Sequence, residues 1–326
     1  MPPVNRNKPV RAASSESQFS FMEFCTRFPD DAACLEHLWR TRYSEDGVHA
    51  VCPKCEMYRV FKKYAMTNRN TSWTCNGCGH HVHPTAGTIY AKSSTSLHLW
   101  FYALYIMAST RCGVSAKQLE RELGVSYKTA WRMFHLIRNQ VMEQDETPLE
   151  GDVEMDETFV GGKLRASDRS AYAGLDQYQR NSAARRRMLE KQTTVFGAVE
   201  RGGRVRATVV PDRTAATLTP HVKSFVLPSS AVFTDDWKAY KEIGKGYRAH
   251  HRINHSEKVY VSGDVHTQTI EGFWSLVKNG IRGAHHAVSA KHLQGYLNEY
   301  AWRYNFRDDP RSMFELLLAR SALPPT

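Results

Sequence analysis

Asp156 stands in a stretch whose pattern predicts a strand, although strands do not favour aspartate. Apolar residues alternate with others through Val153–Lys163, and β-forming residues surround them, which predicts a strand buried on at least one face. The glycines Gly161 and Gly162 then predict a turn. Burying a carboxylate is costly unless a cation pairs with it. Asp156 is therefore a candidate metal ligand.

Two later acids stand in comparable surroundings. Asp235 follows a short apolar run, Ala231–Thr234, which predicts a second strand. Glu271 lies on a predicted amphipathic helix, because apolar residues recur around it at helical spacing. These apolar residues are Ile270, Phe273, Trp274 and Val277. Lys278 follows Glu271 by two helical turns, so both are expected on one helix face, roughly 10 Å apart.

Three carboxylates, two at strand ends and one on a helix, suit two-metal phosphoryl transfer. Carboxylate oxygens bind Mg²⁺, or Mn²⁺ in its place, and phosphate oxygens and waters complete the coordination shell. Two such ions about 3.5–4 Å apart can activate a water and stabilise a leaving oxygen. Two choices stay open, since Glu157 competes with Asp156 and Asp236 competes with Asp235.

The motifs around these acids resemble those of DDE-type transposases of the IS1595 group of bacterial insertion sequences, the ISXO2-like domain. The matching stretches are MDETFVGGK, FTDDWKAY and HTQTIEGFWSLVKNGIRG, in that order. Thirty-five residues separate Asp235 from Glu271, a spacing familiar from DDE enzymes. Some members carry Asn at the third acid, so Glu271 matches the DDE version. The resemblance extends from about Phe21 to Leu318.

This resemblance implies a DNA transposase that binds the terminal inverted repeats of its element. Asp156, Asp235 and Glu271 would hold two Mg²⁺ ions. Water would free a 3′ hydroxyl that then attacks target DNA, with no covalent enzyme intermediate. Lys278 is expected to place a DNA phosphate. The enzyme is expected to act on double-stranded DNA as a homodimer or larger assembly.

Four cysteines predict a structural zinc site. Cys52 and Cys55 form one CxxC pair, Cys75 and Cys78 form another, and nineteen residues separate the pairs. Four thiolates at these spacings complete a tetrahedral Zn²⁺ shell and leave no open position for substrate. The histidines that follow, at 80, 81 and 83, are therefore interpreted as surface groups or DNA contacts.

A helix-turn-helix is predicted between residues 93 and 145. Ser115 and Ser126 can each cap a helix, and Gly124 suits the turn between them. The second helix would present four residues to DNA: Tyr127, Lys128, Thr129 and Arg132. The alternative is a packed helical hairpin that does not contact DNA.

A basic segment, residues 163–191, follows the first acidic strand. It holds eight Lys or Arg against three Asp or Glu. It is interpreted as a solvated mobile loop that could also close over a phosphate backbone. The expected DNA contacts here are Arg185, Arg186 and Arg187, with Arg282 on the basic stretch after Glu271.

The predicted order of elements is three strands, helix, strand, helix, strand, helix. This is the ribonuclease H-like arrangement, an α/β fold in which helices flank a mixed sheet. The expected elements are strands at 193–199, 205–210 and 231–234, helices at 214–226 and 237–243, an extended segment at 248–260, and a helix from His266. The expected domains are a disordered arm (1–17), N-terminal helices with the zinc ribbon (18–92), the helix-turn-helix (93–145) and the catalytic domain (151–318).

Composition narrows the class of partner. The 326 residues carry 44 Lys or Arg and 33 Asp or Glu, a net charge of +11, which favours a polyanion such as nucleic acid. No run of 18 apolar residues predicts a membrane span, and the first residues do not form a signal peptide. Four of the seven cysteines in CxxC pairs fit a reduced compartment, so a cytoplasmic, nucleoid-associated protein is expected.

Two other functions remain open. The chain could be a DNA-binding regulator with an inactive ribonuclease H-like domain, although the intact acids argue against this. It could also be a nuclease that cleaves without joining strands. A zinc ribbon beside a helix-turn-helix favours recognition of a defined DNA end, and so favours transposition.

Overall fold

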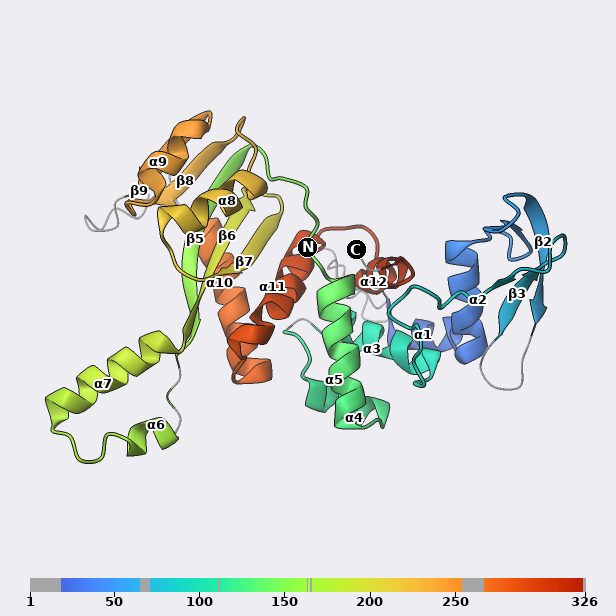
Figure 1. Cartoon of the computed structure of the whole chain (residues 1–326), viewed down its shortest axis with the longest axis horizontal. Helices are drawn as coiled ribbons and strands as arrows, with labels where there is room; N and C mark the ends of the chain where they lie inside the picture. The colour runs from blue at the N-terminus through green and yellow to red at the C-terminus, as the bar shows by residue number, and fades with distance from the viewer. Residues whose placement is uncertain are drawn as a thin grey trace, which may run out of the picture. The chain divides into compact units, whose positions relative to one another are not determined.

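The computed structural model describes residues 19–64, 71–110, 112–162, 164, 166–253 and 267–324 (Figure 1). The chain divides into two compact units. The first unit combines the residues before Glu143 with those from Phe306 onward, and the second unit is Glu143–Asn305. The predicted arm at 1–17, most of the extended segment at 248–260, and His266 lie outside the described residues. Among the described residues, no helix is both long and apolar enough to cross a membrane.

The second unit is built on a five-stranded mixed sheet in the order β7-β6-β5-β8-β9 (Figure 1). The strands are β5 (Asp152–Gly161), β6 (Gln192–Glu200), β7 (Val205–Val210), β8 (Ala231–Asp235) and β9 (Ala249–Ile253). The first three pair antiparallel, whereas β8 is parallel to both β5 and β9. This confirms the predicted mixed sheet.

Helices cover both faces of this sheet. Val153 and Met155 of β5 pack on one face against α8 (Ala215–Phe225) and α9 (Tyr240–Ile243). The opposite face packs against α10 (Gln268–Gly280) and α11 (Ala290–Asn305). A short π-helix, η5 (Ile281–His285), joins these two. Because successive strand residues point to opposite faces, Asp156 and Glu157 face different helical layers.

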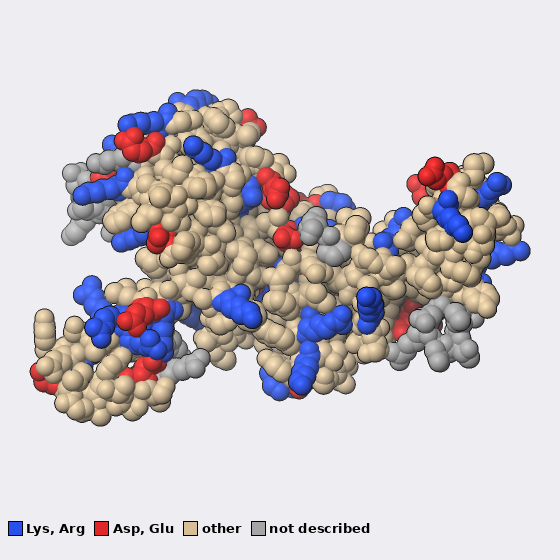
Figure 2. All heavy atoms as spheres, viewed as in Figure 1, with Lys and Arg blue, Asp and Glu red and all other residues tan. Residues whose placement is uncertain are grey.

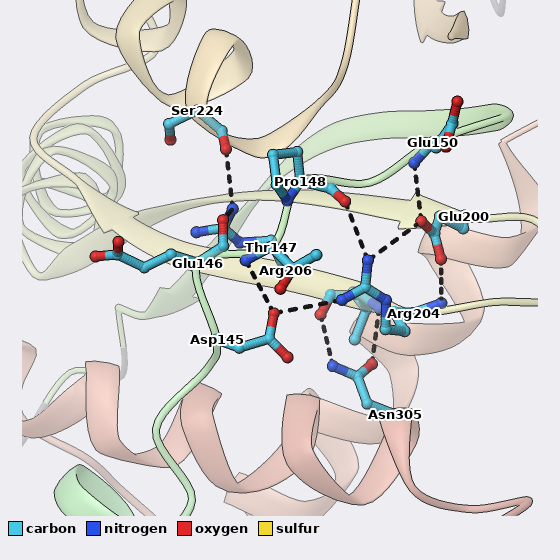
Figure 3. A network of polar contacts seen from close by, with 11 residues as sticks. Asp145, Glu146, Thr147, Pro148, Glu150, Glu200, Arg204, Arg206, Ser224 and Asn305 are labelled. Atoms are coloured by element: carbon cyan, nitrogen blue, oxygen red, sulfur yellow. Dashed lines mark hydrogen bonds and ion pairs between the residues drawn. The ribbon is translucent and has the colours of Figure 1, made fainter. Parts of the chain in front are cut away.

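The segment that leads into β5 is tied to the sheet by two arginines (Figure 3). The guanidinium of Arg204 donates to the Asp145 carboxylate at 3.3 Å and to the Pro148 carbonyl at 3.0 Å. Arg206 donates to the carbonyls of Glu146 and Ser224, at 3.2 and 2.9 Å. These bonds fix the start of β5, and therefore the position of the acids that it carries.

The basic segment after β5 contains two helices rather than a loop. They are α6 (Ala166–Ser170) and α7 (Gln177–Glu190), which protrude from the sheet (Figure 1). A capping box between Asp176 and Gln179 begins α7, and no Gly or Pro interrupts the helix. No residue of α7 is buried, so its helical propensity and cap, not an apolar face, account for its formation.

The first unit combines helices with a four-stranded antiparallel sheet in the order β1-β2-β3-β4. The strands are β1 (His49–Val51), β2 (Tyr58–Tyr64), β3 (Ser72–Cys75) and β4 (His81–Val82). The helices are α1 (Phe21–Arg27), α2 (Asp31–Arg42), α3 (Leu97–Ser109), α4 (Ala116–Leu123), α5 (Tyr127–Leu136), the π-helix η2 (Ile137–Val141) and α12 (Met313–Ser321). Trp39 of α2 stacks on Trp73 of β3 and joins the sheet to the helices.

The last helix, α12, belongs to the first unit, whereas the domain boundary expected from the sequence is residue 318. Phe314 of α12 packs against the rings of Phe24, Phe28 and Tyr105. This aromatic cluster gives α12 an apolar surface to bury, which its short sequence could not identify in advance.

Candidate active site

Parallel pairing between β5 and β8 brings Asp156 and Asp235 to one edge of the sheet. The paired residues include Val153 with Val232 and Glu154 with Phe233. Continuing this register by two residues sets Asp235 opposite Asp156. Both side chains then lie on the face that α10 covers, because side chains alternate along a strand.

A buried acid that the sequence analysis missed holds the start of α10. The Glu154 carboxylate accepts hydrogen bonds from the backbone N–H groups of Thr269 at 2.8 Å and Ile270 at 3.1 Å. It also accepts from the Thr269 hydroxyl at 3.0 Å and from Nε of Arg201 at 2.9 Å. A carboxylate at a helix N-terminus accepts hydrogen bonds from N–H groups that have no partner within the helix. Its negative charge also interacts favourably with the positive end of the helix dipole. Glu154 therefore anchors the helix that carries Glu271.

Trp274 ties the same helix to Asp156. Its Nε1–H donates to the Asp156 carboxylate at 3.1 Å. Gly197 pairs with Asp156 in the sheet, and a Cβ at Gly197 would lie 2.6 Å from the Trp274 ring. The missing side chain of Gly197 thus gives the indole room to reach the carboxylate. Glu271, three residues before Trp274, is exposed and accepts from the Thr267 hydroxyl at 3.3 Å.

The pKa of Asp156 is shifted by its burial and by the groups around it. Burial, the charge of Asp235 and, more weakly, that of Glu271 together raise the pKa of Asp156 to about 6. Hydrogen bonds from the Glu157 backbone and from Trp274 act in the opposite direction. The charges of Asp235 and Glu271 thus both act on Asp156, and a bound divalent cation would offset them.

The competing acids make other contacts. Glu157 faces the opposite helical layer, where it accepts a hydrogen bond from the Tyr240 hydroxyl. Burial raises the pKa of Glu157 to about 7 despite this bond, with further contributions from Asp156 and Asp235. Asp236 pairs with Arg252 at 3.0 Å. Glu157 is therefore not turned toward α10 as Asp156 is, and Asp236 has a basic partner.

A basic hollow of about 940 Å³ lies along the same helix. Lys278 and Arg282 line it from α10 and η5, and Arg187 and Lys191 line it from the end of α7. Figure 2 shows Lys and Arg side chains gathered over α7, with acidic side chains among them. Arg187 pairs with Asp168 and Glu190, at 3.2 and 3.0 Å. Lys191 also pairs with Asp168, so acids offset part of the positive charge on the α7 side of the hollow.

Arg185 and Arg186 do not line this hollow. Both side chains are exposed on α7, and Arg186 lies 3.9 Å from Glu190. They remain available to a polyanion that approaches α7.

In the first unit, the four cysteines of the ribbon converge as a metal site requires. The Sγ atoms of Cys52, Cys55, Cys75 and Cys78 all lie within 4.8 Å of one another. Sulfurs around a tetrahedral Zn²⁺ stand about 3.8 Å apart, given a Zn–S distance of about 2.3 Å. Although burial raises it, backbone N–H groups of Cys55 and Lys54 lower the pKa of the Cys52 thiol to about 6. The donor set fits Zn²⁺.

Among the described residues, this is the one group of three or more potential metal ligands gathered so closely. The three acids are more widely spread than the cysteines. Mg²⁺ needs only one or two protein carboxylates, because waters and substrate phosphate supply its other ligands. An open arrangement of acids is compatible with two ions that bind together with DNA.

The helix pair around Gly124 has the predicted caps. The Ser115 and Ser126 side chains accept from the backbone N–H groups of Gln118 and Thr129, and Gly124 has a φ of +62°. The second helix of the pair exposes three of its four candidate DNA contacts, which are Tyr127, Lys128 and Arg132. The fourth, Thr129, is half-buried, and its hydroxyl lies 3.0 Å from that of Ser126.

Comparison with known proteins identifies similar sequences. A family model described as the ISXO2-like transposase domain matches residues 148–305, nearly the whole second unit. An uncharacterized protein in the transposable element ISH50 of Halobacterium salinarum is 29% identical over 272 residues, covering 79% of this chain and 85% of that protein. An uncharacterized transposase-like protein of Haemophilus influenzae is 31% identical over 102 residues, covering 31% of this chain and 81% of that protein.

Proposed function

The chain belongs to the family of ISXO2-like transposases, and we propose that it cleaves DNA at the ends of an insertion sequence and joins them to target DNA. The observation that carries this proposal is the placement of Asp156. Asp156 lies inside the segment that matches the family and accepts a hydrogen bond from Trp274. The charges of Asp235 and Glu271 contribute to its raised pKa.

In this proposal the second unit is a ribonuclease H-like catalytic domain. Asp156, Asp235 and Glu271 provide the carboxylate oxygens that Mg²⁺ or Mn²⁺ would need. Two bound ions would supply activation of the attacking oxygen and stabilisation of the leaving oxygen. Asp235 is preferred to Asp236, because Asp236 is paired with Arg252. Asp156 is preferred to Glu157, because Glu157 faces the other helical layer and Tyr240 engages it.

The protein's own groups position the reaction. Glu154 fixes the start of α10, and Trp274 fixes its first turns against Asp156. Lys278 and Arg282 lie farther along the same helical segment and would hold DNA phosphates, Lys278 as a point charge and Arg282 through the paired N–H donors of its guanidinium. Arg185, Arg186 and Arg187 on α7 would extend this contact along the strand. Lys278→Ala should therefore weaken DNA placement without removing the carboxylates.

The first unit would select the DNA. We assign the cysteine cluster to a structural zinc ribbon and the α4–α5 pair to a helix-turn-helix. The exposed side chains of Tyr127, Lys128 and Arg132 would meet the terminal repeats, with Thr129 supporting the helix start. The protein would act in the bacterial cytoplasm at the nucleoid, as a dimer or larger assembly on DNA.

A strand-transfer assay tests the proposed function. Purified full-length protein is incubated with Mg²⁺, a DNA fragment that carries the flanking repeats of its element, and a supercoiled target plasmid. Joined products that depend on the repeats support a transposase. Cleavage without joining would indicate a nuclease, and repeat-specific binding without cleavage would indicate a regulator.

A further inference from the structure

Three side chains form an exposed row at the ends of β5 and β8, on the sheet face that α8 and α9 cover. The row consists of Phe159, Arg213 and Trp237. The guanidinium carbon of Arg213 lies 3.9 Å from the centroid of the Trp237 ring and 5.8 Å from that of Phe159. The row adjoins the candidate catalytic acid Asp235, because the backbone N–H of Trp237 donates to the Asp235 carboxylate. Phe159 lies on the strand that carries Asp156, three residues farther along.

The row exposes large apolar rings. Phe159 is 41% exposed and Trp237 is 36% exposed. The other six of the seven tryptophans are buried or half-buried. The charge of Arg213 acts on the nearby Glu157, whose carboxylate also accepts a hydrogen bond from the Tyr240 hydroxyl. The Arg213 side chain is exposed, so its guanidinium can also meet an anionic group of a ligand.

The indole of Trp237 is fixed in advance. Its backbone N–H donates to Oδ1 of Asp235 at 3.1 Å, and its Nε1–H donates to the Arg213 carbonyl at 3.3 Å. The polar edge of the ring is thus already satisfied, and its remaining exposed surface is apolar. A ring held in this way loses little conformational freedom when a ligand packs on it.

Flat rings beside a guanidinium match the chemistry of an unstacked nucleotide. Aromatic side chains and arginine planes stack on base faces, while arginine also binds phosphate. In an intact duplex both faces of each base are covered by neighbouring bases, so only an unpaired base can lie on these rings. We propose that Phe159, Arg213 and Trp237 bind one unpaired nucleobase of the DNA strand next to the phosphate under attack.

This inference rests on the proposed function, because it requires that the second unit binds DNA. Beyond that function, it implies that the two DNA strands are locally unpaired at the reacting phosphate. A base held on Trp237 would fix the strand relative to Asp235, since the backbone N–H of Trp237 is bonded to that carboxylate.

Tryptophan fluorescence of the full-length protein tests the inference without any cleavage. Protein that retains its zinc is titrated, in the absence of Mg²⁺ and Mn²⁺, with a short single-stranded oligonucleotide. A separate titration uses an abasic oligonucleotide of equal length and charge. The base-containing strand should bind roughly tenfold more tightly and quench the fluorescence. Trp237→Leu should remove both the quenching and the preference for bases, and Trp237→Phe should keep the preference while losing the quenching.

A matched control uses Tyr178 of α7, which is 84% exposed. Tyr178→Leu should leave the preference for bases unchanged. Arg213→Gln and Phe159→Leu should each reduce that preference, so the test does not depend on the folding of a single variant. The melting temperature of every variant is measured beside the titrations.

Equal affinity for the two oligonucleotides in the wild-type protein would overturn the inference and leave the proposed transposase function intact. Quenching that grows with protein concentration in the absence of DNA would also overturn it, because a second copy of the chain would then occupy the row. A protein that binds neither oligonucleotide nor duplex DNA would contradict the proposed function itself.

Discussion

Trp274 donates a hydrogen bond from its indole N–H to the carboxylate of Asp156 at 3.1 Å. Because Trp274 lies three residues after Glu271, this bond ties the helix of one candidate catalytic acid to the strand of another. Glu154 holds the start of the same helix through the backbone N–H groups of Thr269 and Ile270. The placement of Glu271 therefore depends on side chains that lie on β5.

Gly197→Ala should disrupt the site without changing any charge. The new Cβ would lie 2.6 Å from the Trp274 ring, so the indole and α10 must move. We expect a loss of about 1–3 kcal/mol in the free energy of unfolding, the usual cost of overpacking. Strand cleavage should fall more than the stability change explains. Denaturant melts and single-turnover cleavage measure the two effects.

Gly246→Ala is the matched control, since a Cβ there would meet no atom within 4 Å and the residue does not have a positive φ. If Gly197→Ala cleaved DNA at the wild-type rate, the bond between Trp274 and Asp156 would not position the site.

Glu154→Gln should loosen the start of α10. The amide retains one acceptor but loses the charge that pairs with Arg201 and faces the helix N-terminus. We expect a loss of about 2–4 kcal/mol of stability. Hydrogen exchange of the amides at the start of α10 should accelerate, and cleavage should require more Mg²⁺ than in the wild type.

Glu242→Gln, at an exposed position, is the control for Glu154→Gln. Unchanged exchange in α10 and an unchanged Mg²⁺ requirement in Glu154→Gln would show that the helix is held by other contacts.

These two tests concern residues whose role the sequence did not reveal. The strand around Asp156 is predictable because apolar residues alternate there, and β8 is predictable from the short apolar run before Asp235. Glu154 looked like one more acid of that strand. Its partners, Thr269 and Ile270, lie more than a hundred residues away, so only the folded sheet brings them together.

For two segments the sequence favours an arrangement that differs from the structure. The basic composition of residues 163–191 favoured a loop, yet the cap at Asp176 and a run free of Gly and Pro form α7. The place of α12 in the sequence, directly after the second unit, favours including it in the domain expected at 151–318. Its aromatic contacts with Phe24, Phe28 and Tyr105 instead place it in the first unit.

Asp156 should make the stability of the metal-free protein depend on pH. Its pKa is raised to about 6 in the folded state from an ordinary value of 3.8. The folded protein therefore binds this proton more tightly than the unfolded chain. The protonated carboxyl group of Asp156 therefore contributes fully to stability below pH 3.8. As the pH rises through about 6 this contribution is lost, and the free energy of unfolding falls by about 1–3 kcal/mol.

Asp156→Asn removes this dependence, so the variant should gain stability relative to the metal-free wild type as the pH rises from 4 to 7. Added Mg²⁺ should stabilise the wild type above pH 6 and have little effect on Asp156→Asn. Thermal melts across this range check both expectations. Parallel curves for the two proteins would contradict the assignment of the raised pKa to Asp156.

The cysteine cluster should hold about one Zn²⁺ per chain and stabilise the ribbon. Cys78→Ser or a strong chelator should remove the metal and unfold this part of the first unit. Cys112→Ser provides the control, since Cys112 is exposed and lies outside the cluster. Metal analysis and circular dichroism follow the change. A folded ribbon with no bound metal would refute the site.

The measurement that bears most directly on the central claim is strand transfer by Asp156→Asn, Asp235→Asn and Glu271→Gln, each compared with Asp236→Asn. The first three changes remove a carboxylate that would bind Mg²⁺, whereas Asp236 is paired with Arg252. All four variants should fold and bind the terminal repeats. We expect the first three variants to lose cleavage and joining in Mg²⁺ and Asp236→Asn to retain both. Full strand transfer by Glu271→Gln, or a loss of strand transfer only in Asp236→Asn, would show that the three acids do not form the catalytic metal site.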